Sequence, residues 1–381
     1  MIAPLSSARF LFATISASVA LFLCHPATGF AQAARTATTP RATATDQEIA
    51  VRFAPLFYQG LGDDARGDYL TNFDFDGDWR GDNNWQHAAD SRFLLKAYVY
   101  YAVCETRTHF FVHYAIFHPR DYKGGRVGGT IWSEIIREGT KQGGKYDPTG
   151  LAREVTLAHE NDMEGCLVVA EKRGGDELRE ARVVYVETLS HNRFLRYVPE
   201  RAGRARRSGE VKIDGQRSRL YVEPKGHGIE AYRAGTKQGA KQGVRLYVYD
   251  AGQAGNPESS TAEESVSYAL LPIYTTLWPR AQRGVNETFG AARDYGTLNL
   301  RFEQAGGRIQ ERRIKVGKIG SAFLGAAGSA NRARPPWGWF DRGDRQQPPG
   351  EWFFDPAATV KRRLRAGDQF ATVYVRHSLV K

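Results

Sequence analysis

The sequence predicts an all-β protein with minor helices, arranged as a β-sandwich or jelly roll with long loops. Short runs rich in Val, Tyr, Phe and Ile recur from residue 97 onward, and these residue types favour strands. Apolar residues at helical spacing are scarce. The 40 glycines and 16 prolines show no fixed period, which excludes a collagen-like chain and indicates many turns between short strands.

The expected strands follow one another along the chain and are separated by loops rich in glycine and charge. They comprise residues 97–103, 110–117, 166–170, 183–188, 220–223, 245–249, 267–273, 297–302 and 371–376. Two segments, 131–138 and 319–327, have the apolar spacing of short helices. The aromatic segments 335–339 and 352–354 are expected to cover the core rather than to bind bases or sugars.

The N-terminal segment has the pattern of a secretory signal peptide. Residues 10–23 form an uncharged apolar run, preceded by Arg9 and followed by the small-x-small site Ala31-Gln32-Ala33. This run is shorter than the roughly 18 residues of a spanning helix, although an uncleaved anchor is the alternative. We therefore expect a signal peptide over 1–33, a flexible leader over 34–47 and a single elaborated domain over 48–381, without a transmembrane segment in the mature chain. The protein is then secreted or periplasmic.

Export places the remaining cysteines in an oxidising compartment. Loss of residues 1–33 removes Cys24 and leaves Cys104 and Cys166, both in strand-like runs. The two residues either form a disulfide or stay buried as separate thiols. A zinc site made of two cysteines alone is not expected.

Acidic residues and one histidine precede the apolar run at 166–170. In an extended segment Asp162 and Glu164 point to the same face, whereas His159 has the opposite parity and needs a turn or bulge to join them. Carboxylates at the mouth of a core strand are costly unless they have partners. We therefore expect the three side chains to converge as a cation site.

The end of the strand at 110–117 is expected to complete this site. Pro119 cannot donate a ladder hydrogen bond, so the strand should stop there and present His118 and Asp121. The ligand set would then be Asp121, His159, Asp162 and Glu164. Three carboxylates and one imidazole favour a hard divalent cation, Mg²⁺ or Ca²⁺ before Mn²⁺, over zinc. The alternative is a surface acidic loop paired with Arg120.

This pattern resembles the necrosis- and ethylene-inducing-like proteins, and also the vacuolar protein sorting-associated protein 62 group. The likeness rests on Tyr114-Ala115-Ile116-Phe117, then Pro119-Arg120-Asp121, then His-x-x-Asp-x-Glu over residues 159–164. In the necrosis-inducing proteins, an Asp after such a strand and the His, Asp and Glu of a Gly-His-Arg-His-Asp-Trp-Glu heptapeptide hold a divalent ion. The resemblance implies these roles for Asp121, His159, Asp162 and Glu164.

The sequence departs from this heptapeptide at three positions. Glu160 replaces its Arg, Asn161 its second His and Met163 its Trp. Because the likeness is concentrated in residues 97–170, it implies the metal site but not cytolytic activity. Segments around His191, His227 and residues 335–339 are similar to stretches of the second group, which adds His227 as a ligand-binding candidate.

A second acidic cluster lies between residues 74 and 84. Asp74, Asp76 and Asp78 surround Gly77, but their order is not that of an EF-hand and no distal Glu closes the loop. The segment forms either an Asx-rich turn or a second calcium site. No Gly-x-Ser-x-Gly elbow or Walker loop is present in the sequence, so it does not indicate serine-nucleophile or nucleotide chemistry.

The net charge of +11 suits an acidic partner. For an exported protein, anionic lipid, glycan or another envelope polyanion is a more available partner than nucleic acid. The first hypothesis is a metal-binding β-sandwich that is not an enzyme and binds a surface ligand such as a lipid headgroup or glycan. The alternative is a divalent-metal-dependent hydrolase in which His118 or His191 moves protons. A third hypothesis makes the acidic residues a folding clamp closed by the ion.

Overall fold

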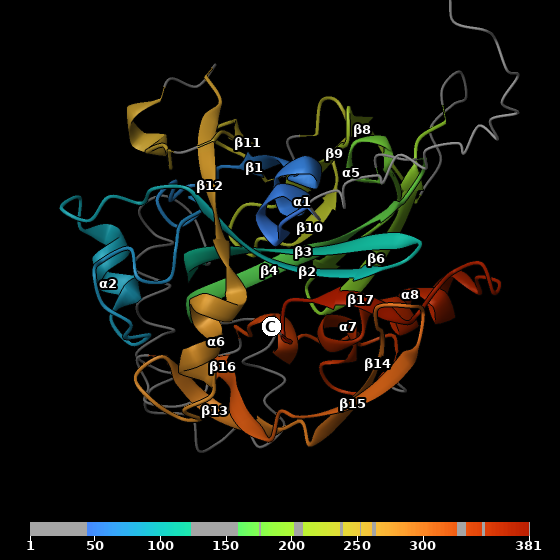
Figure 1. Cartoon of the computed structure of the whole chain (residues 1–381). Helices are drawn as coiled ribbons and strands as arrows, with labels where there is room; N and C mark the ends of the chain where they lie inside the picture. Colours follow the sequence, from blue (N-terminus) through green and yellow to red (C-terminus); the bar gives the residue numbers. More distant parts are fainter. Residues whose placement is uncertain are drawn as a thin grey trace, which may run out of the picture. The chain divides into compact units, whose positions relative to one another are not determined.

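Two long antiparallel strands, β3 and β4, form the centre of the fold (Figure 1). β3 spans His109–Asp121 and β4 spans His159–Glu171, and Asp121 lies opposite His159 in their register. β2 (Tyr98–Thr106) and β5 (Arg182–Ser190) flank this pair. The computed structural model describes residues 44–380, apart from 123–158, 175–176, 202–208, 237–238, 252, 261–263, 326–332 and 345–346.

These strands belong to a large mixed sheet with the strand order β10-β9-β1-β11-β12-β2-β3-β4-β5-β6-β7. The further members of this path are β1 (Leu56–Gly60), β6 (Arg193–Pro199), β7 (Glu210–Val211), β9 (Arg217–Val222), β10 (Ile229–Ala231), β11 (Val244–Tyr249) and β12 (Val266–Pro272). Four strands lie off the path: β8 (Ile213–Asp214) on β9, β17 (Tyr374–His377) on β2, β14 (Thr297–Glu303) on β17, and β15 (Ile309–Lys315) on β14. β13 (Phe289–Asp294) and β16 (Lys318–Phe323) form a separate two-stranded sheet.

The helices are short and lie between the strands or after them. They are α1 (Asp46–Phe53), α2 (Asn84–Ala89), α5 (Glu177–Glu180), α6 (Leu277–Ala281), α7 (Glu351–Phe354), α8 (Pro356–Leu364), η1 (Pro257–Ser259), η2 (Ile273–Thr275) and η3 (Pro336–Gly338). A capping box starts α1, because Thr45 Oγ1 accepts from the Glu48 N–H and the Glu48 carboxylate accepts from the Thr45 N–H. Within the described ranges, no helix has the length and apolarity to cross a membrane.

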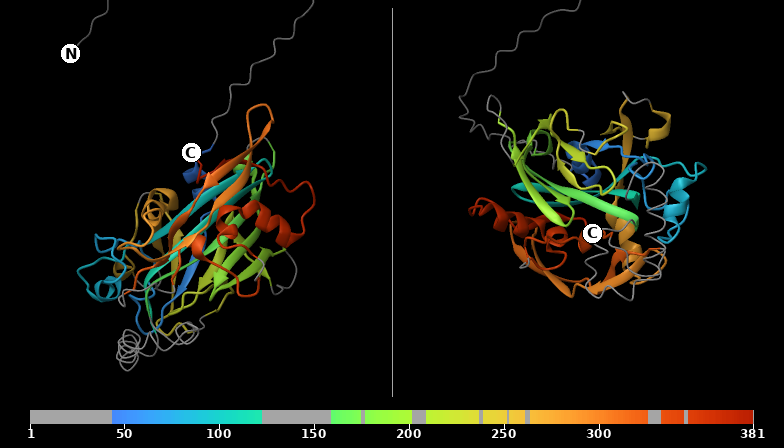
Figure 2. Two further views of the ribbon diagram at one scale, coloured as in Figure 1. Left: turned by 90° about the horizontal axis from the view of Figure 1, so that it is seen from below. Right: turned by 180° about the vertical axis from the view of Figure 1, so that it is seen from behind.

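The central strands are buried on both faces. Successive side chains of a strand point to opposite sides of the sheet, so each strand contributes to two core clusters. On β3, Phe111 and Phe117 pack with the C-terminal segment in one core cluster. Val112 and Ile116 pack with residues of α1 and of β9 to β12 in the other. Figures 1 and 2 show the central strands between these two layers. Burial on both faces explains why these strands are almost continuously apolar in sequence.

Aromatic residues of the C-terminal segment cover one face of the sheet, as predicted for 335–339 and 352–354. Trp337 and Trp352 are fully buried in the cluster on that face. The Trp352 ring stacks on Phe194 of β6, with ring centroids 4.7 Å apart. The packed aromatic rings of this segment therefore cover β2 to β6.

The predicted fold class is confirmed, since the described chain is mostly strand with few helices. Each of the predicted strands overlaps an observed one. The short helical segments predicted near 319–327 are wrong over the described residues, because residues 318–323 form β16 and pair with β13. The strand at 110–117 does not stop at Pro119 either, since β3 continues to Asp121. The predictions for the signal peptide and for 131–138 lie outside the described residues.

The two cysteines are free and buried, so the disulfide alternative is wrong for this fold. Cys104 lies on β2 and Cys166 on β4, with β3 between them. Cys104 belongs to one core cluster and Cys166 to the other, which places them on opposite faces of the sheet. Two strand spacings separate the residues by about 9–10 Å, beyond the reach of a disulfide.

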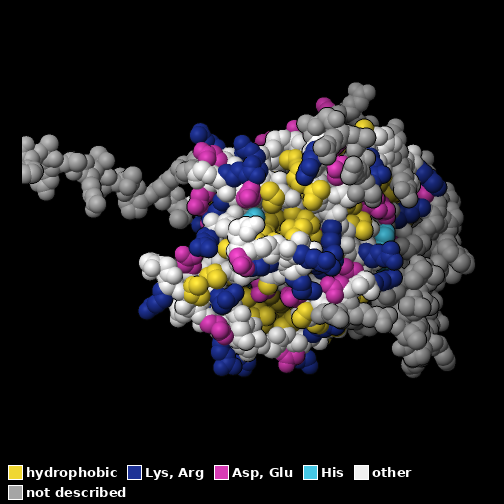
Figure 3. All heavy atoms as spheres, turned by 90° about the vertical axis from the view of Figure 1, so that its right-hand side faces the viewer, with side chains coloured by type: hydrophobic (Ala, Val, Ile, Leu, Met, Phe, Trp, Pro, Cys, Tyr) yellow, Lys and Arg dark blue, Asp and Glu magenta, His cyan; other side chains and the backbone are white. Residues whose placement is uncertain are grey.

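Basic and acidic side chains are interspersed on one face of the protein. On the face shown in Figure 3, Lys and Arg side chains alternate with Asp and Glu around an apolar area. Such a mixed face creates no single strong field. On this face, charge-specific recognition therefore has to come from local clusters of side chains.

Candidate functional site

The four predicted metal ligands lie at one end of the β3–β4 pair. His159 and Asp121 face each other in the register, with His159 Nε2 3.4 Å from Asp121 Oδ2. Asp162 lies opposite His118, and Glu164 lies opposite Ile116. All four predicted ligands line a single cavity of about 70 Å³. The cavity is enclosed further by Leu189, His191, Asn192, Gly226, Ala333, Arg334, Trp339 and Arg342.

Asn161 provides the backbone irregularity that the parity of His159 requires. Its φ of +57° is in the left-handed region, which Asn tolerates better than most residues. Its buried side chain holds this conformation, since Nδ2 donates to the Gly81 carbonyl at 2.7 Å and to the Leu324 carbonyl at 2.8 Å. Oδ1 accepts from Asn84 Nδ2 at 2.6 Å. The Asn that departs from the family heptapeptide therefore has a structural role.

Glu164 is a ligand candidate that lies among other acids and has an oxygen without a hydrogen bond. Its carboxylate is buried, and Oε2 has no hydrogen-bond partner. Burial raises the pKa of Glu164 well above its ordinary value, and the nearby Asp162 and Asp121 raise it further, against the lowering effect of a hydrogen bond from the His191 backbone. A cation among these carboxylates would supply the missing partner and remove the repulsion. The donor set therefore fits a hard divalent ion.

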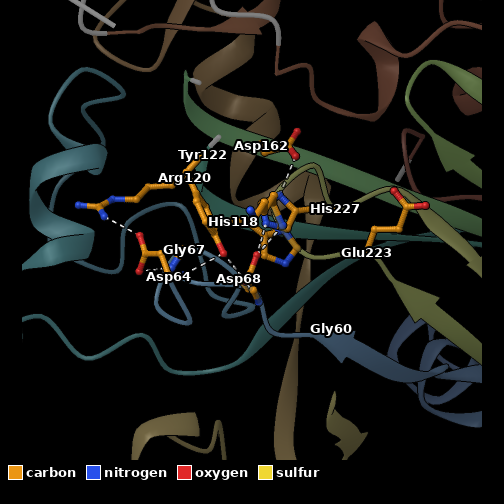
Figure 4. Close-up of polar contacts among 12 residues, drawn as sticks. Gly60, Asp64, Gly67, Asp68, His118, Arg120, Tyr122, Asp162, Glu223 and His227 are labelled. Atoms are coloured by element: carbon orange, nitrogen blue, oxygen red, sulfur yellow. Dashed lines mark hydrogen bonds and ion pairs between the residues drawn. The ribbon is translucent and has the colours of Figure 1, made fainter. Parts of the chain in front are cut away.

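His227 lies between the carboxylates of Asp162 and Asp68 (Figure 4). Its Nδ1 is 2.8 Å from Asp162 Oδ2, and its Nε2 is 3.3 Å from Asp68 Oδ1. Burial lowers the pKa of His227, but the hydrogen bonds with Asp162 and Asp68 raise it more, to about 9. His227 is not among the residues that line the cavity, and its hydrogen bond with Asp162 can orient that carboxylate.

Asp68 is the second carboxylate beside His227, and no sequence motif identifies it. Its fully buried carboxylate accepts from the Gly62 N–H at 2.7 Å, from the Lys225 N–H at 2.7 Å and from the Tyr122 hydroxyl at 2.9 Å. These donors come from three separate segments of the chain. The sequence shows Asp68 only as one of many acids in loops, and a local pattern could not have identified it.

His118 does not lie on the cavity, contrary to its candidate role in proton transfer. It is fully buried, its Nε2 is 3.0 Å from Gln59 Oε1, and its ring stacks on His227 with centroids 3.7 Å apart. Burial lowers the pKa of His118 well below its ordinary value, and His227 lowers it further. Because β3 continues past Pro119, the His118 side chain enters the core instead of ending a strand.

His191 does line the cavity and comes from the two-residue turn between β5 and β6. His191 and Asn192 have φ of +51° and +58°, which is typical of a tight hairpin turn. The His191 side chain is 56% exposed, and its Nε2 is 2.8 Å from Glu223 Oε2. That hydrogen bond raises the pKa of His191, against the opposing effect of burial. A Cβ at Gly226 would come within 2.8 Å of the His191 ring, so a side chain there would displace the ring from its present position.

Arg120 belongs to a neighbouring network rather than to the cavity. Its Nε donates to the Trp85 carbonyl at 2.8 Å, and its Nη1 donates to Asp64 Oδ2 at 2.8 Å. Its guanidinium lies over the Trp85 ring, 4.9 Å from the centroid. Figure 4 shows Arg120 and Asp64 pointing away from Asp162 and His227. These contacts attach α2 to the end of β3.

The second acidic cluster is built from Asx turns with a histidine at its side. The Asp78 N–H donates to Asp76 Oδ1 at 3.1 Å, and the Arg80 N–H donates to Asp78 Oδ1 at 2.7 Å. His87 Nδ1 is 2.5 Å from Asp76 Oδ2. In the part of the chain that the structure describes, Asp76, Asp78 and His87 are the group that brings its candidate ligand atoms within 4.8 Å of one another. The four residues of the 70 Å³ cavity are more widely spread.

Comparison with known proteins gives structural neighbours alone, since no family model and no curated protein matches the chain. The non-toxic HaNLP3 protein is similar with a TM-score of 0.28 and 13% identity, over 63% of this chain and 80% of that chain. Necrosis and Ethylene inducing Protein 2 from the causal agent of cocoa's Witches Broom disease has a TM-score of 0.24 and 14% identity, over 50% and 69%. NLPPya in complex with glucosamine has a TM-score of 0.27 and 14% identity, over 51% and 70%.

These neighbours belong to the family that the motif around His159 resembles. At such TM-scores and identities the likeness itself carries no argument about the site. The cavity and its residues are therefore interpreted from their own geometry and chemistry.

Proposed function

We propose that this protein is exported, binds a divalent cation through Asp121, His159, Asp162 and Glu164, and uses the bound cation to hold a surface ligand. The carrying observation is that these four side chains line one cavity, in which the buried Glu164 Oε2 has no partner. Mg²⁺ or Ca²⁺ suits the three carboxylates and one imidazole, since both ions prefer oxygen ligands. Contacts from His227 and Asp68 would hold Asp162 in its ligating orientation.

The ligand class that suits such a site is a glycan or a lipid headgroup. A protein-held hard cation keeps coordination positions that hydroxyl or phosphate oxygens can occupy. The cavity wall also carries His191, Arg334 and Arg342, which can contact polar groups of a ligand. NLPPya has been solved with mannosamine and with glucosamine, so these sugars are suitable first probes.

Calorimetric titration with Mg²⁺ and Ca²⁺ tests the cation site. Asp162→Asn should weaken binding by about 100-fold, as expected for loss of a charged ligand with its orienting network. Asp76→Asn in the second acidic cluster is the matched control and should leave the affinity unchanged. If Asp76→Asn abolishes binding and Asp162→Asn does not, the cation site is the Asp76, Asp78 and His87 cluster and the proposal is wrong. Circular dichroism of both variants confirms that they fold.

A metal-dependent hydrolase remains the second candidate because His191 is exposed at the cavity and hydrogen-bonded to Glu223. Such a pair can move a proton to or from a metal-bound water. Cation-dependent release of product from a phosphodiester or glycan, lost in His191→Gln while cation affinity stays intact, would favour this function. Absence of any cation-dependent turnover would favour binding.

A further inference from the structure

The short helix α2 contacts both strands that carry the predicted cation ligands. Its first two residues, Asn84 and Trp85, are buried. Trp85 hydrogen-bonds to the end of β3, which carries Asp121, and Asn84 hydrogen-bonds to the start of β4, which carries the other three ligand candidates. None of the described residues that line the cavity of these ligands belongs to α2. The helix therefore acts on the site through the two strands rather than as a source of ligands.

On β4, Asn84 holds the side chain of Asn161, the residue with the left-handed backbone conformation. Asn84 Nδ2 donates to Asn161 Oδ1 at 2.6 Å, and both residues are fully buried. Asn161 lies between His159 and Asp162, and both of these ligand candidates face the cavity. Because the amide pair is shielded from water, loss of the Asn84 donor would leave the Asn161 oxygen unsatisfied. A shift of Asn161 would then move His159 and Asp162 with it.

The loop before α2 fixes the other end of the Asn161 amide. Asn161 Nδ2 donates to the Gly81 carbonyl at 2.7 Å and to the Leu324 carbonyl at 2.8 Å. A Cβ at Gly81 would lie 2.5 Å from the Leu324 carbonyl oxygen and 3.2 Å from Asn161 Nδ2, so these segments approach closely only because residue 81 is a glycine. Asn161 thus keeps its position as long as α2 and the loop before it stay in place.

On β3, Trp85 holds Arg120, the neighbour of the ligand candidate Asp121. Arg120 Nε donates to the Trp85 carbonyl at 2.8 Å, and Nη2 donates to the same oxygen. The guanidinium also lies over the Trp85 ring, 4.9 Å from its centroid. Figure 4 shows the Arg120 side chain extending from β3 toward α2. Because Arg120 lies opposite Glu160 in the register, adjacent residues of α2 hold β3 and β4 at the point where the two strands pair.

Deepening the function proposed above, on which it rests, we propose that α2 determines the cation affinity by holding the ligand-bearing ends of both strands. Asn84 and Asn161 are positioning residues for the ligands of β4, and Arg120 is a positioning residue for Asp121. Groups that orient metal ligands from the outer shell typically change metal affinity about 10- to 100-fold. A hard cation also needs several oxygen ligands at set distances at once, so a small shift of one strand end weakens several contacts together.

Calorimetric titration of Asn84→Ala with Mg²⁺ and Ca²⁺ tests the proposal. This variant should bind the cation about tenfold more weakly or worse. Tyr268→Phe is the matched control, because it also removes one buried hydrogen bond, from the Tyr268 hydroxyl to the Pro55 carbonyl at 2.8 Å. The control should lose stability in urea and keep the cation affinity of the wild type. Wild-type affinity in Asn84→Ala, or equal weakening in both variants, would overturn the proposal.

Two further variants test the route through each strand. Asn161→Gly tolerates the left-handed conformation but lacks the amide, so adding Asn84→Ala to it should cause no further loss of affinity. Full additivity of the two losses would contradict action through Asn161. Arg120→Lys keeps the charge beside Asp121 but cannot make the paired guanidinium bonds to the Trp85 carbonyl, so it should also weaken cation binding. Wild-type affinity in Arg120→Lys would overturn the role assigned to β3.

Luminescence of bound Tb³⁺, a hard cation that can stand in for Ca²⁺, separates positioning from a general loss of structure. Its lifetimes in H₂O and D₂O count the waters on the ion, and a ligand that moves away is replaced by water. Asn84→Ala should gain a bound water and Tyr268→Phe should not. Weaker binding with an unchanged water count would show a merely structural role.

A measurement without cation keeps this proposal distinct from the proposed function. If the wild-type protein binds neither Mg²⁺ nor Ca²⁺, the proposed function fails. Hydrogen exchange in chelator over residues 159–164 then decides whether α2 holds the ligand segment. Exchange should be faster in Asn84→Ala than in Tyr268→Phe, and equal exchange in the two variants would overturn the positioning role.

Discussion

Glu164 on β4 and Glu187 on β5 are both buried carboxylates, but their surroundings differ. Arg363 and the Trp352 indole N–H, at 2.8 Å, donate to Glu187, and Arg196 is 3.4 Å away. Glu164 instead has Asp162 and Asp121 as neighbours and an oxygen without a hydrogen bond, although Arg334 lies in the same cavity wall and interacts with it electrostatically. A buried charge whose oxygens are all hydrogen-bonded holds a fold together, whereas one with acidic neighbours and an unpaired oxygen is suited to a ligand. The first region is structural, and the second is a candidate site.

Removing Arg363, the positively charged partner of Glu187, should give the largest effect on stability. Arg363→Met leaves the fully buried Glu187 without its main counter-charge, and we expect the free energy of unfolding to fall by about 3 kcal/mol. Urea denaturation at neutral pH measures the change. Arg362→Met is the control, because Arg362 is half exposed and pairs with Glu351, so its loss should cost less than about 1 kcal/mol. Equal losses in the two variants would contradict the structural role of Glu187.

Low pH should destabilise the same structural region, because two of its histidines are buried. Burial lowers the pKa of His113 to about 3 and that of His377 to about 4, although hydrogen bonds with the carbonyls of Trp352 and Phe354 raise both. Both histidines titrate near 6.5 when unfolded, so the unfolded chain takes up protons first as the pH falls. Their contribution is complete above pH 6.5 and is lost progressively down to the folded pKa values.

We expect a loss of about 2 kcal/mol per histidine between pH 6.5 and 5. Because the pKa values of His118 and His109 are lowered as well, the test compares the wild type with His113→Gln, whose loss of stability between these two pH values, measured by urea denaturation, should be smaller by about 2 kcal/mol. An unchanged pH dependence in His113→Gln would show that His113 does not stay neutral in the folded state.

The smallest effect, and the one with the opposite sign, is expected at Glu164. In the presence of chelator, Glu164→Gln removes repulsion from Asp162 and Asp121, and the free energy of unfolding should rise by about 1 kcal/mol. With excess Mg²⁺ the wild-type protein should gain about 2.7 kcal/mol at 100 times the Kd, and the variant should not. Thermal unfolding with and without Mg²⁺ measures both terms. A Glu164→Gln variant destabilised in chelator as strongly as Glu187→Gln would remove the contrast between the two regions.

The candidate ligands that the sequence predicted lie together where their contacts are local. Asp162 and Glu164 lie two residues apart in one strand, and β3 and β4 are antiparallel partners, so these acids and Asp121 share one end of the pair. His159 could be included because the need for a backbone irregularity is visible in its parity, and Asn161 provides it. The prediction that the strand ends at Pro119 is wrong because a missing donor N–H does not by itself end a strand, and β3 continues through Pro119 to Asp121.

Other parts of the site depend on contacts between distant segments. His227 Nε2 reaches Asp68 across 159 residues, and Arg342 reaches the Asn192 turn across a comparable distance in the chain. No periodicity or motif records such a meeting. The same holds for the fate of the cysteines, because their separation by β3 and their opposite faces follow from strand pairing.

The order of apolar and polar residues along the chain was enough for the all-β class, the central strands and a cluster of candidate ligands, because these depend on neighbours within a strand or hairpin. Packing across the sheet decided the rest. It decided whether those ligands face a cavity, which buried acid has compensating partners, and which arginines lie beside the site. Burial changes the energy of a charge far more than its position in the sequence does, and burial is a property of the folded chain.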